Sequence, residues 1–387
     1  MIISPKIRMI ILFLIAFAAS WLIYRPILKI AKDKNMTDNP DARKLQKVPV
    51  PVLGGIAVFF GVVVGLCYFK TMLNYVSLFP LLGAMVIMLY VGTIDDIVDL
   101  SPWLRIALEI GVALLLIYGN HRVVIDFGGL WGISRLSLFV AVPLTVLMCV
   151  GLVNAMNMID GVDGLVSAMC IFECLCFGLL FFLAHDYSFA ALCAVLVGAL
   201  LPFVFHNVFG CETKMFIGDG GTMMVGIAIS AMVIEMLCGR FSVVAYQPWM
   251  DFNMVAMSLA VMSVPVADTL RVMMARIFRG VSPFKADNNH FHHLLIRSGF
   301  SHIGTVAIMV SLNALVVAVW LLAWWAGASA GWQLAAVILA ALAADLGVAS
   351  FLGRRIARRG ELRYTGGDAA GVRPGLWNKI QSFVDRF

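Results

Sequence analysis

The stretch LFPLLGAMVIMLYVGTIDDIVD, residues 78–99, joins a long apolar run to a cluster of carboxylates. Residues 78–94 contain no Asp, Glu, Lys or Arg, and a helix of this length is about 26 Å long, close to the hydrocarbon thickness of a bilayer. Asp95, Asp96 and Asp99 follow, where such a helix would leave the membrane. The stretch therefore predicts a transmembrane helix that ends in a cluster of carboxylates at the membrane surface.

Similar apolar runs recur along the whole chain. It has 387 residues, of which 62% are hydrophobic and only 13% are charged, and its mean hydropathy is +0.96. No soluble core needs this much apolar sequence, so we predict an all-α polytopic integral membrane protein with about eleven transmembrane helices. The predicted spans are residues 9–24, 52–69, 78–94, 104–118, 137–153, 163–184, 187–203, 221–238, 253–275, 304–326 and 332–352.

These spans leave no room for a second globular domain. We predict one transmembrane catalytic domain, residues 1–352, and a basic cytoplasmic tail, residues 353–387, whose apolar spacing favours an amphipathic helix in the membrane interface. The first apolar run resembles a signal peptide, but its continuation to Ile23 favours an uncleaved helix. The eight cysteines lie mostly inside apolar runs, as small buried residues do.

The basic residues are distributed unevenly between the two sides of this topology. Most of the 28 Lys and Arg fall in the loop after the first span, in the loop after the ninth, and in the C-terminal tail. By the positive-inside rule, this bias places the N-terminus outside and the C-terminus in the cytoplasm. The net charge of +6 then reflects topology and suits an anionic lipid leaflet, and it gives no reason to expect a nucleic acid partner.

Five polar clusters fall on the cytoplasmic side of the predicted topology. They are the basic loop at 25–47, the acids at 95–99, NAMNMIDGVDG at 154–164, FIGDGG at 216–221 and KADNNHFHHLL at 285–295. The loops on the other side of the membrane are short or contain no such polar cluster. One face of the membrane is therefore predicted to carry the chemistry.

The acids at 95–99 have no Lys or Arg predicted beside them. Asp95 and Asp99 share one face of a helix, and carboxylates so close together repel each other. A divalent cation or a raised pKa would relieve this repulsion. The alternative is a solvated helix end, against which the apolar neighbours Ile94, Ile97 and Val98 argue.

Polar residues recur at every third position between 154 and 163. Asn154, Asn157, Asp160 and Asp163 would line one side of a helix end, and the glycines that follow the acids allow a ligand close to the backbone. Amides and carboxylates together offer donors and acceptors, as recognition of a nucleobase or a sugar requires. The alternative is a polar loop with helix caps.

Asp219 lies in a glycine-rich turn at the start of the predicted span 221–238. Converging backbone N–H groups and the positive end of that helix would favour a phosphate, with or without a metal ion. An ordinary glycine-rich turn is the alternative.

Three histidines crowd into the last cluster: His290, His292 and His293. Basic residues such as Arg276 and Lys285 precede them, so the loop is strongly cationic. Because imidazole donates hydrogen bonds to phosphate and titrates near neutrality, we predict contacts with phosphate or sugar. Zinc ligation and a purely structural loop are the alternatives.

The predicted cytoplasmic face thus combines acids suited to Mg²⁺, a glycine-rich anion site and a cationic histidine loop. This combination suits a nucleoside diphosphate bound with magnesium. Because the clusters lie at a membrane surface, the second substrate is predicted to be a lipid.

The motifs resemble those of the polyprenyl-phosphate N-acetylhexosamine-1-phosphate transferases, a membrane superfamily with WecA-like and MraY-like branches. The resemblance covers residues 25–352, with PVPVLGG at 49–55, DDIVD at 95–99, NAMNMIDGVDGL at 154–165, FIGDGG at 216–221 and SPFKADNNHFHH at 282–293. The HFHHL form of the last motif is similar to the WecA-type branch. Gln46 and Val52 depart from the family pattern in the first loop.

The resemblance implies roles for the matching residues. Four of them would be catalytic: Asp95, Asp96, Asp160 and His290. Three would hold Mg²⁺, with Mn²⁺ as an alternative: Asp219, Asp95 and Asp96. Eight would bind substrate, with Asp163 and Asn207 beside the uracil base: Lys47, Asn154, Asn157, Asp163, Asn207, Arg276, His292 and His293.

The reaction implied is transfer of N-acetylglucosamine 1-phosphate, or a related N-acetylhexosamine 1-phosphate, from a UDP-sugar to undecaprenyl phosphate, with release of UMP. It would start a lipid-linked cell-surface glycan at the cytoplasmic face of a bacterial inner membrane. Asp95 would accept the proton of the lipid phosphate, and a covalent aspartyl intermediate is an open alternative. An MraY-like phospho-MurNAc-pentapeptide transferase, a transporter for an anionic nucleotide or lipid, and a non-catalytic membrane scaffold are alternative functions. A homodimer is also left open.

Overall fold

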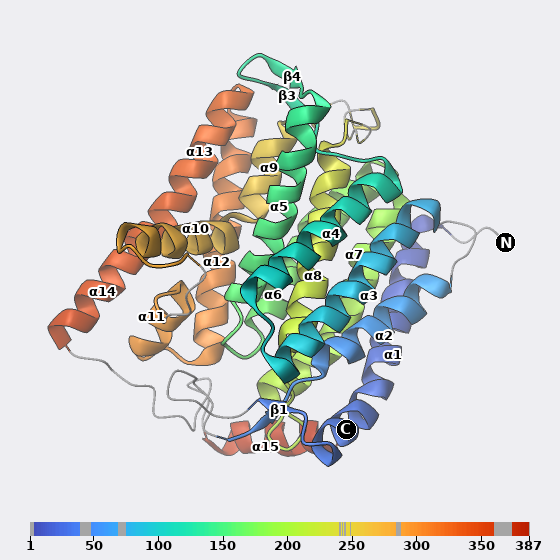
Figure 1. Ribbon diagram of the computed structural model, residues 1–387, viewed down its shortest axis with the longest axis vertical. Helices are drawn as coiled ribbons and strands as arrows, with labels where there is room; N and C mark the ends of the chain where they lie inside the picture. Colours follow the sequence, from blue (N-terminus) through green and yellow to red (C-terminus); the bar gives the residue numbers. More distant parts are fainter. Residues whose placement is uncertain are drawn as a thin grey trace.

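Long helices run side by side through most of the molecule (Figure 1). The computed structural model describes residues 4–38, 48–68, 75–239, 241, 243, 245–247, 249–283, 288–359 and 374–386. The helices are α1 (Pro5–Asp33), α2 (Gly54–Cys67), α3 (Tyr75–Val98), α4 (Pro102–Asn120), α5 (Leu138–Met158), α6 (Leu165–Leu183), α7 (Tyr187–Phe209), α8 (Gly218–Leu237), α9 (Met254–Val261), α10 (Ser263–Phe278), α11 (Phe291–Arg297), α12 (His302–Trp325), α13 (Ala330–Leu342), the π-helix η1 (Ala343–Gly347), α14 (Val348–Arg359) and α15 (Pro374–Arg386). Two short antiparallel strand pairs, β1 (Thr37–Asp38) with β2 (Val50–Pro51) and β3 (Asp126–Leu130) with β4 (Ile133–Arg135), lie at opposite ends of the helix bundle.

Nine helices among the described residues are long and apolar enough to cross a membrane. They are α1, α3 to α8, α12 and the continuous run Ala330–Arg354, and each overlaps one predicted span. The chain is therefore a multi-pass, mostly helical membrane protein, as predicted. The orientation of its termini stays a prediction.

The other two of the eleven predicted spans are not single long helices. Helix α2 has 14 residues, about 21 Å, which is shorter than a full crossing. The predicted span 253–275 is broken into α9 and α10, which are bent by 75°. The described residues thus give nine spans, or ten if the bent pair counts as one, and the count of eleven is not confirmed.

The break between α9 and α10 is stabilised by a side chain from another helix. Pro265 has no N–H and cannot donate to the carbonyl of Val261, so a continuous helix would lose a hydrogen bond there. Nδ2 of Asn313, on α12, donates to that carbonyl at 2.6 Å. Its Oδ1 accepts from the hydroxyl of Ser263 at 2.8 Å and from the N–H of Val264 at 2.9 Å. The freed backbone groups are therefore satisfied, as a membrane interior requires.

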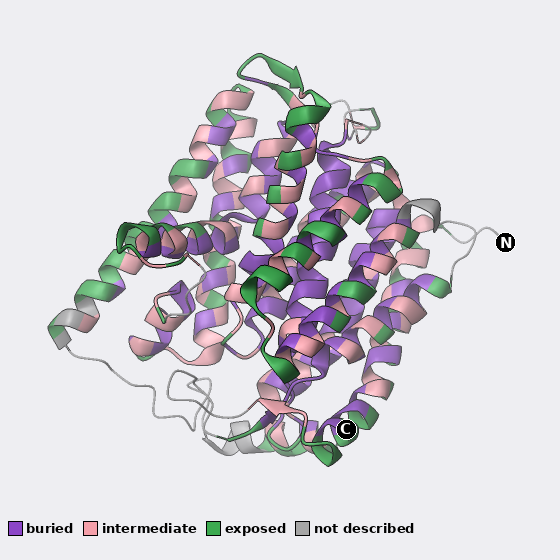
Figure 2. Cartoon of the chain, viewed as in Figure 1, coloured by how far each residue is buried: buried purple, intermediate pink, exposed green. Residues whose placement is uncertain are grey.

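Helix α8 forms the buried centre of the bundle, and Figure 2 shows the buried residues gathered around it. Every residue of this helix is buried except Asp219. The outer helices α1 and α12 instead expose large apolar residues, including Leu22 and Leu322. This distribution is typical of a bundle whose outer surface faces lipid.

Glycines allow α3 and α8 to pack backbone against backbone. A Cβ on Gly92 of α3 would lie 2.4 Å from the carbonyl carbon of Asp219, and one on Gly220 of α8 would lie 2.7 Å from the carbonyl oxygen of Leu89. Small residues permit such close approach between membrane helices. The acids at the end of α3 are therefore brought directly against the start of α8.

The C-terminal helix α15 packs against the turn between α7 and α8. Oδ1 of Asp385 accepts hydrogen bonds from the N–H groups of Cys211, Glu212 and Thr213, each at 3.1 Å. Nη2 of Arg25, on α1, donates to the carbonyl of Asp385 at 2.6 Å. The turn that leads into α8 is thus held from both ends of the sequence. The predicted division of the chain at residue 352 and the predicted membrane contact of the tail stay predictions.

Replacing Gly92 by Ala is expected to push α3 away from α8. Overpacking of this kind costs about 1–3 kcal/mol, so the thermal unfolding midpoint in detergent should fall by several degrees. Gly83→Ala on the same helix is the matched control, because a Cβ at Gly83 meets nothing within 4 Å. Equal unfolding midpoints for the two variants would contradict the close packing of α3 on α8.

Candidate active site

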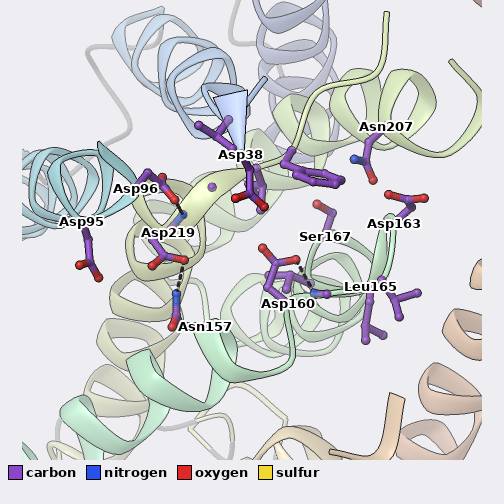
Figure 3. A pocket seen from close by; sticks show the side chains of 18 of the residues that line it. Asp38, Asp95, Asp96, Asn157, Asp160, Asp163, Leu165, Ser167, Asn207 and Asp219 are labelled. Atoms are coloured by element: carbon purple, nitrogen blue, oxygen red, sulfur yellow. Dashed lines mark hydrogen bonds between the residues drawn. The ribbon is translucent and has the colours of Figure 1, made fainter. Parts of the chain in front are cut away.

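A cavity of about 650 Å³ lies where α3 and α5 end and α8 begins. It is lined by members of several predicted clusters: Asp95, Asp96, Asp99, Asn157, Asp160, Asp163, Asn207, Asp219 and His293. In Figure 3, Asp95, Asp96 and Asp219 lie toward one end, Asp163 and Asn207 toward the other, and Asp160 between them. The structure therefore brings together motifs that are far apart in the sequence.

A smaller cavity of about 300 Å³ adjoins the first and shares several of its lining residues. Asn154, Arg276 and His290 line only this smaller cavity among the predicted site residues. Arg105, Asn157, Asp160 and His293 line both. The histidine segment and the acids thus meet along the shared boundary of the two cavities.

The carboxylate of Asp96 caps the N-terminus of α8. Its Oδ1 and Oδ2 accept hydrogen bonds from the N–H of Asp219 at 3.1 and 2.9 Å. Gly218 has a φ of +71°, and a Cβ on it would lie 2.6 Å from Oδ2 of Asp96, so only glycine fits there. The predicted anion site at this helix start is therefore occupied, in part, by a carboxylate of the chain itself.

Arg105, on α4, lies among the acids, although the sequence suggested that no basic residue was beside them. Its Nη1 donates to Oδ2 of Asp95 at 3.1 Å and lies 3.9 Å from Oδ2 of Asp219. Its Nη2 donates to the side-chain oxygens of Asn154 and Asn157 at 3.0 and 3.2 Å. The prediction that no Lys or Arg lies beside these acids was therefore wrong, because the turn after Asp99 returns the chain as α4 with Arg105 facing the acids.

The sequence contains a signal that could have predicted this position of Arg105: an acid, Glu109, lies four residues further along the same apolar helix. Glu109 is buried in an apolar helix, and its Oε1 lies 3.5 Å from Nε of Arg105. Its Oε2 accepts from Nδ2 of Asn154 at 2.5 Å. An acid inside a membrane helix requires a partner, so the pair at positions 105 and 109 points to a polar cluster.

Of the four polar residues spaced three apart at 154–163, Asn154 and Asn157 lie on α5, whereas Asp160 and Asp163 lie in the loop between α5 and α6. Nδ2 of Asn157 donates to Oδ1 of Asp219 at 3.0 Å and to the hydroxyl of Thr222 at 2.9 Å (Figure 3). Asn154 lies one turn earlier and binds Glu109 and Arg105. The two amides therefore join α4, α5 and α8 at the acid end of the cavity.

Asp160 lies between the two ends of the larger cavity. Burial, and then the nearby charge of Asp219, raise the pKa of Asp160 to about 7. The N–H of Gly161 donates to its Oδ1 at 3.0 Å and acts in the opposite direction. This carboxyl group can therefore change its protonation near neutral pH.

Asp163 is held by two basic residues from other parts of the chain. Its Oδ2 lies 2.7 Å from Nζ of Lys214 and 2.7 Å from Nδ1 of His302. Burial acts to raise the pKa of Asp163, but the hydrogen bonds and charges of His302 and Lys214 outweigh it and hold this pKa below its usual value. Asp163 is therefore a fixed negative charge at its end of the cavity.

Asn207 lines the same end of the cavity as Asp163. Its Nδ2 donates to the carbonyl of Met215 at 2.9 Å, which leaves its side-chain oxygen available as an acceptor. Lys47, the other residue predicted to reach the nucleotide, lies outside the described residues.

The three histidines have different surroundings. His290 and His293 line the cavities, and His290 is paired with Asp268 of α10. His292 lines neither cavity: it is fully buried beneath Gly161, whose Cβ would lie 3.0 Å from its Nε2. Burial, and then the charges of its neighbours His293 and His290, hold the pKa of His292 well below its usual value. Direct substrate contact was predicted for His292, but it has a supporting position under the 159–164 loop.

The carboxylates of the larger cavity offer oxygen ligands for a metal ion, but they do not form a complete coordination shell. Among the described residues, no group of three or more His, Cys, Asp or Glu side chains is arranged to hold a metal ion. Mg²⁺ is usually held by one or two carboxylates together with water and substrate phosphates, so an open set suits it. Asp219, Asp95 and Asp96 are the hard donors closest to this role.

The sequence matches known proteins over most of its length. Residues 78–237 match the family described as glycosyl transferase family 4. The Escherichia coli (strain K12) undecaprenyl-phosphate alpha-N-acetylglucosaminyl 1-phosphate transferase is 25% identical over 76% of this chain and 78% of its own length. A Bacillus subtilis (strain 168) protein, named "Probable undecaprenyl-phosphate N-acetylglucosaminyl 1-phosphate transferase", is 28% identical over 80% of this chain and 85% of its own. These matches confirm the family resemblance predicted from the motifs.

Asp163→Asn is expected to destabilise the folded protein at neutral pH. Because the pKa of Asp163 is lowered on folding, its ionised form stabilises the folded state at pH values above the unfolded aspartate pKa, about 4. This contribution is lost as the pH falls through the lowered pKa. The difference in thermal unfolding midpoint between wild type and variant should therefore be largest above about pH 5 and shrink on acidification.

Asp33→Asn is the matched control for this series, because it removes the same charge at an exposed position at the end of α1. It should leave the unfolding midpoint unchanged. A difference for Asp163→Asn that grows as the pH falls would contradict the lowered pKa.

Proposed function

Because this chain is related to glycosyl transferase family 4 and to undecaprenyl-phosphate N-acetylglucosaminyl 1-phosphate transferases, we propose that it catalyses this class of reaction. N-acetylglucosamine 1-phosphate would pass from UDP-N-acetylglucosamine to undecaprenyl phosphate, with release of UMP. One observation carries the proposal: acids from α3, α8 and the α5–α6 loop converge on one cavity at the end of a multi-pass helix bundle. A water-soluble nucleotide and a membrane lipid can meet at such a place.

Cationic side chains near the acids support binding of phosphate-bearing substrates. Arg105 lies at the acid end, Lys214 contacts Asp163 at the opposite end, and Arg276 lines the smaller cavity. Arginine binds phosphate through paired N–H donors, and lysine does so as a point charge. A diphosphate that lay along the cavity would have a cation within reach of each end.

Magnesium is the cofactor that we propose. Its preference for oxygen ligands matches the donor set of Asp219, Asp95 and Asp96, and Mn²⁺, which shares this preference, is the alternative. When bound, Mg²⁺ would neutralise the diphosphate and stabilise the departing UMP. The side chains of α3 and α8 would hold it against the phosphates.

Asp160 suits the role of proton acceptor better than Asp95 does. Both oxygens of Asp95 already accept hydrogen bonds, from Arg105 at 3.1 Å and from the N–H of Leu100 at 2.8 Å. Asp160 lies mid-cavity with a pKa of about 7, and a base acts best when its pKa is near the working pH. An oxygen of the lipid phosphate would give its proton to Asp160 and bond to the β-phosphorus of the donor. The bond from that phosphorus to the UMP oxygen would break.

The other end of the larger cavity suits the uridine of the donor. Asp163 offers a fixed carboxylate and Asn207 an amide oxygen, and both accept hydrogen bonds from N–H groups such as the one on uracil. This assignment leaves the sugar beside the smaller cavity, with Arg276, His290 and His293. We propose N-acetylglucosamine as this sugar, following the names of the relatives.

We propose that the site faces the cytoplasm of a bacterial inner membrane. Arg25 and Lys32, near the end of α1, contact Asp385 and the carbonyl of Glu212, next to the turn that leads into α8 and Asp219. The basic end of α1 and the cavity are therefore at the same end of the bundle. By the positive-inside rule, that end is cytoplasmic.

Purified protein incubated with Mg²⁺, undecaprenyl phosphate and UDP-N-acetylglucosamine should release UMP and form an equal amount of lipid-linked sugar. Asp219→Asn is expected to lower turnover about 100-fold or more, because it removes a charge from the proposed metal site and keeps the side-chain shape. Asp126→Asn, on β3 at the opposite end of the bundle, is the matched control and should keep wild-type turnover. Chromatography of UMP measures both.

Three outcomes would contradict parts of this proposal. Full turnover in Asp219→Asn would exclude Asp219 as the metal ligand. Turnover with UDP-MurNAc-pentapeptide and none with UDP-N-acetylglucosamine would favour the MraY-like alternative. Passage of intact UDP-sugar into sealed vesicles, without release of UMP, would favour a transporter.

A further inference from the structure

A buried ionic network lies behind His290. Asp268 of α10 is fully buried, and its Oδ2 lies 3.0 Å from Nδ1 of His290. Its Oδ1 accepts hydrogen bonds from the N–H of Phe291 at 2.9 Å and from Nη2 of Arg271 at 2.5 Å. Both oxygens of Asp268 are therefore engaged, one with the imidazole ring and the other with two N–H donors.

Arg271 extends this network to the C-terminal membrane span. Its Nε donates to Oδ2 of Asp345 at 2.8 Å, and its Nη2 also donates to the carbonyl of Asn289 at 3.1 Å. Asp345 lies in η1, a π-helical turn within the run Ala330–Arg354. Single π turns inside α-helices are frequent at functional sites. The position of Asp268 is thus fixed by a second helix as well as by its own.

The orientation of His290 follows from these contacts. The two ring nitrogens of an imidazole lie on opposite edges, and Nδ1 is turned toward Asp268. His290 lines the smaller cavity, so the edge that carries Nε2 is the one left to face it. The His290 side chain is only 4% exposed, so packing holds the ring in this orientation.

We propose that Asp268 is a positioning residue that fixes the tautomer of His290. Asp268 accepts the hydrogen on Nδ1, so that Nε2 presents a lone pair to the smaller cavity. Arg105 and Arg276 in that cavity can only donate hydrogen bonds, and this nitrogen joins Asp160 there as an acceptor. It accepts a hydrogen bond from a substrate O–H group. That group is either a sugar hydroxyl or the P–OH of the lipid phosphate, and in the second case His290 takes the place of Asp160 as the acceptor of the phosphate's proton. This inference rests on the proposed transferase function.

Packing alone gives no reason for such a network. Buried charges lose their hydration, and well-packed apolar residues of the same volume often hold two helices together equally well. Oδ1 of Asp345 is buried without a hydrogen-bond partner among the described residues, which adds to this cost. The network has an explanation in its effect on His290, because it restricts the imidazole ring to one orientation.

Asp268→Asn tests the proposal, because it keeps the size and shape of the side chain. The asparagine oxygen should turn to the two N–H donors, Phe291 and Arg271, so that its NH₂ group faces Nδ1 of His290. Nδ1 then becomes the acceptor, and the hydrogen moves to Nε2. kcat is expected to fall about 100- to 10,000-fold, the range for a reversed or lost acid–base partner. Asp268→Glu, which retains a carboxylate, should recover part of this loss.

Nitrogen-15 NMR of labelled histidine measures the tautomer of His290, and this measurement does not depend on enzymatic activity. The His290 signals are identified by their loss in His290→Gln, and spectra are recorded at a pH where the ring is neutral. Wild type should carry the hydrogen on Nδ1, and Asp268→Asn should carry it on Nε2. A wild-type ring with its hydrogen on Nε2 would overturn the proposal whether or not the transferase reaction is correct. The expected tautomer in a protein that releases no UMP would instead overturn the reaction alone.

Steady-state constants for each substrate identify the source of the O–H group. A higher KM for UDP-sugar in Asp268→Asn indicates a sugar hydroxyl, and a lower kcat with both KM values unchanged indicates the lipid phosphate. Asp251→Asn, at an exposed position before α9, is the matched control and should leave all constants unchanged. Wild-type kcat and KM in Asp268→Asn would contradict the proposal. If the Asp268→Asn variant does not fold, the His290 tautomer in the wild-type NMR spectrum still tests the proposal.

Discussion

The cavity depends on how closely α3 approaches α8. Gly92 and Gly220 leave no side chain between the two backbones, so the carboxylate of Asp96 reaches the N–H of Asp219. One acid thereby caps the helix that carries another, and the positive end of α8 lowers the electrostatic cost of a negative charge at this place. The contacts of Arg105 with Asp95 and Asp219, and that of Asn157 with Asp219, are built on the wall that these two helices form.

Opposite charges share each end of the cavity before any substrate is bound. The guanidinium of Arg105 donates hydrogen bonds to Asp95 and to two side-chain amides, and Lys214 contacts Asp163. A phosphate that enters must compete with these carboxylates for the same cations, so its binding energy is the difference between two sets of ion pairs. A cation brought in with the substrate would reduce that competition, because it supplies the acids with a new partner.

Local sequence properties predicted much of this structure. Apolar run length located nine helices, because that signal belongs to a single helix. The spacing at 154–163 located four polar residues that line the two adjoining cavities, although only Asn154 and Asn157 lie on α5. Features that depend on distant residues were missed. The break after α9 needs Asn313, fifty residues further on, and Arg105 meets the acids only after α4 folds back along α3. His292 shares its motif with two cavity-lining histidines, yet helical rotation on α11 turns it inward.

The contact between Asp385 and residues 211–213 spans 172 to 174 positions of the chain. During synthesis α7 and α8 are made and enter the membrane long before α15 exists. Until then, water has to satisfy the N–H groups of this turn, and Lys214, the next residue, has a less firmly held backbone. The turn beside the Asp163 end of the cavity therefore gains these hydrogen bonds only at the end of biogenesis, after every helix that lines the cavity has been made.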